Sequence, residues 1–158
     1  EVVGKAAYVA WHQDVTYWGL RPPKAISVWL AIDDVDEENG AMLVIPRTHA
    51  QTFEHGKSDD DENLLSVNQA IDDGALDVDT AVPIILKAGQ ISLHDGLLVH
   101  GSRPNHSGRR RAGVTIRYTT PDVVPVPDPN KRVHWQPVLV RGEDRYGNWP
   151  LKSAPVFN

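Results

Sequence analysis

The sequence predicts a mainly β protein, built as a sandwich or barrel of short strands. Short segments rich in β-branched residues recur between turn signals, and stretches with the 3.6-residue period of an amphipathic helix are scarce. The expected strands cover residues 5–14, 25–32, 41–45, 82–86, 90–94, 97–100, 111–118 and 134–140. Residues that tolerate tight-turn backbone separate several of them, namely Asn39-Gly40, Lys87-Ala88-Gly89, Asp95-Gly96 and Ser107-Gly108.

Two of these strands alternate in a way that indicates a lumen. In strand 25–32 one face carries Ile26, Val28, Leu30 and Ile32, and the other face carries Ala25, Ser27, Trp29 and Ala31. Strand 111–118 has an apolar face of Ala112, Val114, Ile116 and Tyr118, and its other face holds Arg111, Gly113, Thr115 and Arg117. The second faces are too polar for a closed core. We expect them to line the lumen of a barrel that holds a ligand, with the apolar faces packed outward against covering elements.

Length and composition indicate one globular domain over residues 1–158, with a catalytic core at about 5–140. Residues 51–79 are polar and acidic, so we expect a surface insertion or a lid there. The net charge of -5 argues against nucleic-acid and anionic-membrane partners. Because the chain has no Cys, thiol chemistry is excluded and a cytoplasmic location is expected. The chain begins at Glu1 with a strand close behind, and we expect an N-terminal segment to be missing.

A candidate metal site lies in the run AWHQDVTYW. Residues two apart on a strand point the same way, so His12 and Asp14 would present an imidazole and a carboxylate on one face. His100 offers a third ligand at the end of an apolar segment, just before a glycine. Two histidines and one carboxylate leave three positions of an octahedral ion open, which suits Fe(II), a chelating co-substrate and dioxygen.

A candidate site for a carboxylate follows shortly after His100 in the sequence. Arg111 would begin the next strand beside it, facing the lumen, and its guanidinium can clamp a carboxylate through two parallel hydrogen bonds. Ser102 can add a hydroxyl to the same carboxylate. Arg109 and Arg110 compete for this role, but we expect them to face solvent or the opposite side.

Three ordered motifs resemble the phytanoyl-CoA dioxygenase family over most of residues 5–120. They read WHQDVTYWGLRP, then ISVWLAIDDVDEENGAMLVIPRTH, then ISLHDGLLVHGSRPNHSGRRRAGVTIRY. The resemblance implies a double-stranded β-helix of the jelly-roll, cupin-like kind, with Fe(II) bound by His12, Asp14 and His100. It also implies 2-oxoglutarate as co-substrate, with its distal carboxylate at Arg111 and Ser102 and with Trp29 lining the pocket.

The resemblance further implies a reaction. Members of the family decarboxylate 2-oxoglutarate to succinate and carbon dioxide and hydroxylate a small-molecule substrate with O2. Halogenating relatives replace the carboxylate ligand by a small residue, so Asp14 favours hydroxylation. The run HQDVTYWGL looks like members that act on small organophosphonates, whose charge Arg21, Lys24 or Arg117 would meet.

Three alternatives stay open. His94 and Asp95 form a rival pair of ligands, although Asp95-Gly96 is better explained as a turn, which leaves His94 beside the metal or in a structural role. The chain could be a cupin-like module that binds a metal or a sugar without a co-substrate, but such a module has no need of Arg111. It could also be a catalytically inactive relative.

Overall fold

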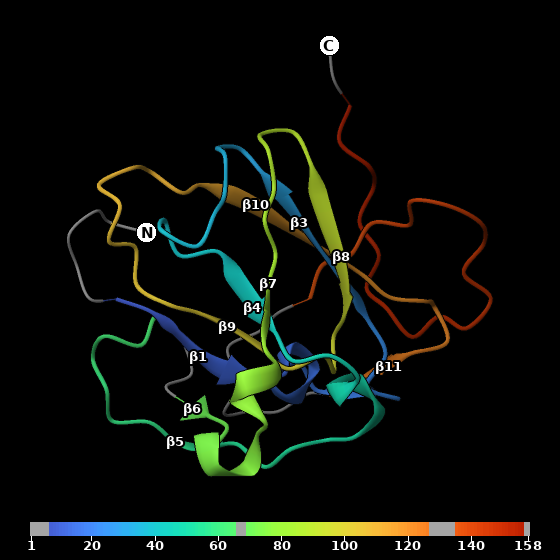
Figure 1. Ribbon diagram of the computed structural model, residues 1–158. Coiled ribbons are helices and arrows are strands. Elements are labelled where there is room, and N and C mark those ends of the chain that lie inside the picture. The colour runs from blue at the N-terminus through green and yellow to red at the C-terminus, as the bar shows by residue number, and fades with distance from the viewer. Residues whose placement is uncertain (1–6, 66–68, 127–134, 157–158) are drawn as a thin grey trace.

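Two antiparallel sheets form the body of the protein, as the computed structural model shows (Figure 1). The structure describes residues 7–65, 69–126 and 135–156. One sheet has the order β1-β9-β4-β7, with strands Val9–His12 (β1), His100–Ser102 (β9), Met42–Val44 (β4) and Val82–Pro83 (β7). The other has the order β10-β3-β8, with strands Gly113–Tyr118 (β10), Ile26–Ala31 (β3) and Ile91–Asp95 (β8).

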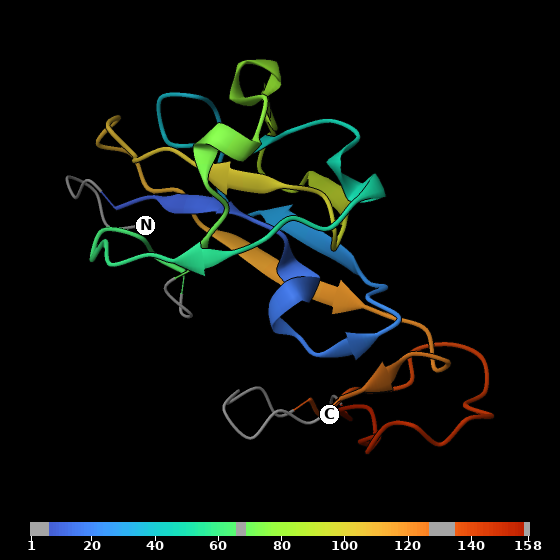
Figure 2. The same ribbon diagram turned by 90° about the horizontal axis from the view of Figure 1, so that it is seen from below.

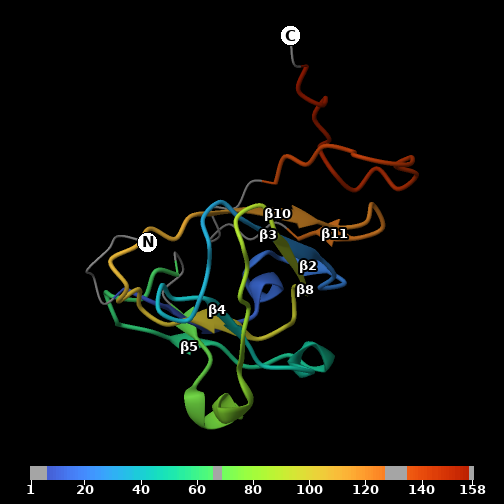
Figure 3. The ribbon, with the colours of Figure 1, turned by 45° about the horizontal axis from the view of Figure 1, so that its top comes forward.

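Short elements connect and extend these sheets. Two further pairs of strands are Leu20–Arg21 (β2) with Val124–Pro125 (β11), and Gly56–Lys57 (β5) with Gln69–Ala70 (β6). The helical elements of the described residues are all single 3-10 turns, at Asp14–Tyr17 (η1), Thr48–Ala50 (η2), Asp73–Ala75 (η3) and Val78–Thr80 (η4). Figure 3 shows the two sheets as separate layers with η1 between them. No helix in the described ranges is long and apolar enough to cross a membrane.

The register of the three-stranded sheet confirms the alternation expected from the sequence. Trp29 lies opposite Thr115 on β10 and opposite Ser92 on β8, so these three side chains share one face. By the same register Ser27 and His94 are partners on this inner face, which is turned toward η1. The outer face carries the apolar set, and the described residues cover it only in part, since Val28 is buried whereas Ile91 is 52% and Leu93 is 63% exposed.

Several predicted strands are corrected at their ends. Strand 5–14 ends at His12, because Asp14 begins η1, and its first two residues lie outside the described part. The expected strand 97–100 is a turn that continues into β9 only at His100, because the N–H of Leu97 donates to Oδ1 of Asp95. The expected strand 82–86 is shorter, ending at Pro83.

The expected strand 134–140 is wrong for its described part, residues 135–140. Val138 makes only an isolated bridge with Lys152 there. Pro137 has no N–H to donate to a strand ladder, which disfavours pairing on both sides. Figure 2 shows this last part of the chain as loops at one end of the molecule, beyond β11.

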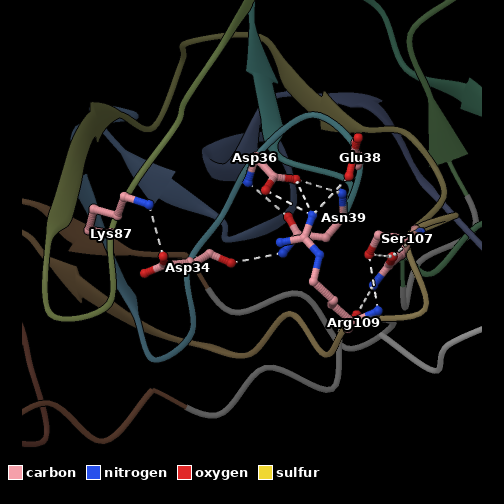
Figure 4. Close-up of polar contacts among 8 residues, drawn as sticks. Asp34, Asp36, Glu38, Asn39, Lys87, Ser107 and Arg109 are labelled. Carbon is pink, nitrogen blue, oxygen red and sulfur yellow. Dashed lines mark hydrogen bonds and ion pairs between the residues drawn. The ribbon is translucent and has the colours of Figure 1, made fainter.

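Polar contacts join the loop after β3 to the loop before β10. The buried side chain of Asn39 accepts from the N–H of Asp36 and donates to the carbonyl of Asp34, which closes the first loop. Arg109 donates to both carboxylate oxygens of Asp36 at 2.9 Å and to Glu38 at 3.2 Å (Figure 4). Each pair is largely exposed and contributes little alone, but together they fix the course of the chain into β10.

The core is divided among three clusters of buried apolar residues. The cluster of Val15, Leu20, Ala25 and Val123 packs beneath η1 and β2. A second cluster contains Ile45, Val99 and Ile71, and Ile71 comes from residues 51–79. This segment therefore supplies part of the core, and the carbonyl of Trp11 accepts a hydrogen bond from the N–H of Ile71.

Candidate metal centre

His12, Asp14 and His100 come together in the interior. His12 is the last residue of β1 and pairs in register with His100, the first residue of β9. Their rings are 4.1 Å apart between centroids. One ligand atom from each of the three side chains lies within 4.8 Å of the other two, and all three residues are buried. The group can therefore hold a metal ion.

Asp14 joins this group as its spacing from His12 predicts, although β1 ends at His12. The intervening Gln13 keeps the extended backbone of a strand, with φ -117° and ψ 122°, so the side chains of His12 and Asp14 point the same way. The turn η1 begins only at Asp14. Oδ1 of Asp14 lies 3.7 Å from Nε2 of His12.

The tautomers of both histidines are set by backbone carbonyls. Nδ1 of His12 lies 2.9 Å from the carbonyl oxygen of Ala10, and Nδ1 of His100 lies 2.9 Å from that of Leu98. A carbonyl oxygen only accepts, so each Nδ1 must carry the proton. Each Nε2 then has a lone pair for a metal, as is usual for ligating histidines.

The charge states of Asp14 and His100 suit a cation. Burial would raise the pKa of Asp14, but the imidazoles of His12 and His94 and the hydroxyl of Ser27 outweigh it, so the pKa of Asp14 lies far below its usual range. Burial lowers the pKa of His100 to about 3, with a further contribution from His12. At neutral pH the group thus contains a carboxylate and a neutral His100.

Gln13 lies between His12 and Asp14 in the sequence, and its hydrogen bonds hold this segment in place. Its side chain is fully buried and donates to the carbonyls of Gln51 and Leu97. Its Oε1 accepts from the N–H of Phe53, and its own N–H donates to Nε2 of His55 at 3.0 Å. No local pattern in the sequence marks Gln13, because its partners lie in distant loops.

Two further polar side chains border the group. His94, on β8, has Nε2 3.8 Å from Oδ2 of Asp14, and its ring centroid is 4.7 Å from that of His100. Tyr17, on η1, has its ring centroid 6.4 Å from that of His12, and burial raises the pKa of its hydroxyl. Neither ring nitrogen of His94, nor the hydroxyl of Tyr17, has a hydrogen-bond partner among the described residues. The sequence signal for Tyr17 was its place three residues after Asp14.

The residues expected at a carboxylate site are also on the inner side. The guanidinium carbon of Arg111 lies 5.9 Å from the centroid of the Trp29 ring. The ring lies across Gly113, where an added Cβ would overlap the indole of Trp29. Ser102 is buried on β9, two residues after His100 and therefore on the same face. Arg109 and Arg110 face away, and Arg110 pairs with Asp33 at 2.8 Å.

A family model for phytanoyl-CoA dioxygenase (PhyH) matches residues 1–113 of this chain. The chain belongs to the phytanoyl-CoA dioxygenase family. Among the relatives is a probable alpha-ketoglutarate-dependent hypophosphite dioxygenase of Stutzerimonas stutzeri, 30% identical over 121 residues that span 76% of this chain and 42% of the relative. The peroxisomal phytanoyl-CoA dioxygenase of Mus musculus is 28% identical over 115 residues, 70% of this chain and 33% of the relative. The chain thus spans less than half of these relatives.

Solved structures confirm the jelly-roll fold expected for a phytanoyl-CoA dioxygenase family member. The apo form of ThoJ, a non-heme monooxygenase, is 30% identical, with a TM-score of 0.71 over 95% of this chain and 52% of ThoJ. EvdO2 from Micromonospora carbonacea var. aurantiaca, in complex with 2-oxoglutarate, is 24% identical with a TM-score of 0.65, over 84% of this chain and 54% of EvdO2. At 24% identity, the similarity to EvdO2 shows a shared fold alone.

Proposed function

We propose that this chain is the metal-binding part of an Fe(II)- and 2-oxoglutarate-dependent dioxygenase that hydroxylates a small organic substrate. His12, Asp14 and His100 hold the iron in this proposal. The observation that carries it is the buried group of two imidazoles and one carboxylate with ligand atoms within 4.8 Å of one another. Two histidines and a carboxylate leave adjacent coordination positions for a co-substrate and dioxygen.

The residues present fit Fe(II) in three respects. Both histidines have Nδ1 engaged by a carbonyl, which leaves Nε2 to the metal. Asp14 is ionised, and Ser27 holds its second oxygen at 2.6 Å. The chain contains no Cys, so a thiolate zinc site is excluded.

The site for 2-oxoglutarate is assigned to Arg111, Ser102 and Trp29. Arg111 provides the fork that a distal carboxylate requires, and Trp29 provides a flat apolar wall beside it. Ser102 lies on the same strand and face as His100, so its hydroxyl is on the metal side of the sheet.

Iron, when bound with 2-oxoglutarate and O2, supplies the oxidation that converts 2-oxoglutarate to succinate and carbon dioxide and adds a hydroxyl group to the substrate. The chain's own residues orient the reactants and exclude water. The hydrogen bonds of the Gln13 side chain hold His12 and Asp14 in place. The burial of the site limits competing reactions with solvent. Asp14 occupies the position that a halogenase leaves open, so hydroxylation is favoured.

A small organophosphonate is the substrate that we favour. The relative in Stutzerimonas stutzeri is described as acting on hypophosphite, another small oxyanion of phosphorus. Arg117 is the cation that we favour for the substrate's charge, because it is opposite Ser27 in the register and so shares the inner face of the sheet. Its guanidinium carbon lies 5.0 Å from the Trp18 ring centroid, whereas Lys24 is near Asp122 at 3.8 Å.

Anaerobic titration of the Fe(II) protein with 2-oxoglutarate tests the proposal. We expect a weak visible charge-transfer band from the chelate, and we expect Asp14→Ala to abolish it. Arg111→Ala should retain the metal but require far more 2-oxoglutarate. Metal binding without any such band, in the folded protein, would instead favour a cupin-like binding module or an inactive relative.

A further inference from the structure

His94 is a buried imidazole that has no partner for either ring nitrogen among the described residues. The residue is 9% exposed and the side chain 6% exposed. A buried polar group without a hydrogen bond typically costs about 1–3 kcal/mol, so such groups are rare unless something else binds them. The position of His94 indicates what that partner is.

The register of β8 against β3 directs His94 to the candidate metal centre. His94 is the partner of Ser27, whose hydroxyl donates to Oδ2 of Asp14. Nε2 of His94 lies 3.8 Å from the same oxygen, which is too far for a hydrogen bond but within electrostatic contact. The imidazole therefore borders the three ligands without belonging to the group whose atoms meet within 4.8 Å.

A second unpaired group continues the same face of β8. Ser92 precedes His94 by two residues, is the register partner of Trp29, and has a buried Oγ without a partner among the described residues. Trp29 in turn lies beside Arg111. The inner face of β8 thus extends from the neighbourhood of Arg111, through Ser92, to His94 beside Asp14.

We propose that this face of β8 is one wall of the 2-oxoglutarate site and that His94 donates a hydrogen bond to the end of 2-oxoglutarate that chelates the metal. The inference rests on the proposed function, because it takes the distal carboxylate to be at Arg111. His94 is neither a metal ligand nor a packing residue in this assignment. His94 aligns the chelating end of 2-oxoglutarate, and Ser92 contacts the carbon atoms between the two ends of the co-substrate.

The test compares His94→Leu, His94→Gln and the wild-type protein in three measurements: the dissociation constant for Fe(II) alone, that for 2-oxoglutarate with Fe(II) bound, and the melting temperature without ligands. His94→Leu should leave Fe(II) binding within about threefold and weaken 2-oxoglutarate binding about tenfold to a hundredfold, as expected for losing a hydrogen bond to a charged group. It should also shift the charge-transfer band. His94→Gln, which keeps an N–H at similar reach, should restore most of the affinity.

Melting temperatures separate this role from packing. Leu has similar bulk and carries no unpaired polar atom, so His94→Leu should keep or raise the melting temperature while it weakens 2-oxoglutarate binding. A matched control is His49→Leu, which replaces an exposed histidine and should change none of the three measurements.

Three outcomes would overturn the inference. An unchanged affinity for 2-oxoglutarate in His94→Leu would remove His94 from the site. A large loss of Fe(II) affinity would make it a fourth ligand, and a lower melting temperature with equal losses of both ligands would make it a structural residue. Failure of the proposed function has a different signature, since the wild-type protein itself would then show no 2-oxoglutarate chelate.

Discussion

Ser27 donates a hydrogen bond of 2.6 Å from Oγ to Oδ2 of Asp14, and both residues are buried. The bond joins the three-stranded sheet to η1 and leaves Oδ1 of Asp14 facing His12. The hydrogen bond therefore orients the carboxylate in the absence of a metal, which is the usual role of a group that hydrogen-bonds to a metal ligand.

Replacing Ser27 by Ala should therefore weaken metal binding. We expect the Fe(II) dissociation constant, measured by anaerobic calorimetric titration, to rise about tenfold, within the range typical for loss of such a partner. Ser153→Ala, at an exposed position, is the control and should bind as the wild type does. Equal affinities in Ser27→Ala and the control would show that Asp14 needs no support from β3.

Gln13→Glu should destabilise the fold as well as the site. The substitution removes two donated hydrogen bonds and places a charge against the carbonyls of Gln51 and Leu97. We expect a loss of about 3 kcal/mol, which lowers the melting temperature by roughly 6–12 °C in a chain of this length. Gln51→Glu is a matched control, since its exposed side chain makes none of these contacts. Thermal unfolding followed by circular dichroism measures both, and similar curves would contradict the prediction.

Gly113→Ala should impair the co-substrate site. A Cβ at this position would overlap the Trp29 indole, so the ring must move away from its place beside Arg111. We expect affinity for 2-oxoglutarate to fall about tenfold, with an overpacking cost of about 1–3 kcal/mol in stability. The control is Gly56→Ala, where the nearest atom to the new Cβ is 4.0 Å away. Tight binding by Gly113→Ala would mean that Trp29 does not line the pocket.

The metal-free protein should lose stability as the pH falls below about 6.5. Burial lowers the pKa of His100 to about 3, so between these values the unfolded chain binds a proton that the folded chain does not. Stability therefore rises with pH across this window, by about 1.4 kcal/mol per pH unit for one such group. Burial also lowers the pKa of His55, and its contribution has the same sign.

Urea unfolding at a series of pH values, in the presence of a chelator, measures this slope. His100→Leu should reduce it by the contribution of one proton, whereas exposed His106→Leu should leave it unchanged. Identical slopes in the wild type and His100→Leu would show that His100 is not buried as a neutral imidazole in the metal-free state.

Much of the site could be predicted from the sequence, because its main signals are local. His12 and Asp14 are two residues apart, and His100 precedes a glycine, so these three could be selected as candidate ligands before any fold was known. The alternation in strand 25–32 likewise assigned Ser27 and Trp29 to the inner face, because side chains on a strand alternate regardless of what the strand contacts.

The ends of strands were less predictable. The sequence predicts a strand that ends at Asp14 and another that begins at Leu97, but Asp14 begins a 3-10 turn and Leu97 is held in a turn by Asp95. In both cases a local hydrogen bond or a capping position competes with the strand ladder, and residue preferences distinguish these poorly.

The sequence by itself determined the candidate ligands, the strand faces and the exclusion of thiol chemistry. Only the tertiary structure decided which side chains surround the ligands. His94 faces Asp14 because β8 and β3 pair in one register, and a shift of that register by one residue would turn His94 to the outside. Trp29 lies beside Arg111 because Gly113 leaves room for the indole on the neighbouring strand. Such relations depend on pairing between segments that are distant in the sequence, which no local pattern encodes.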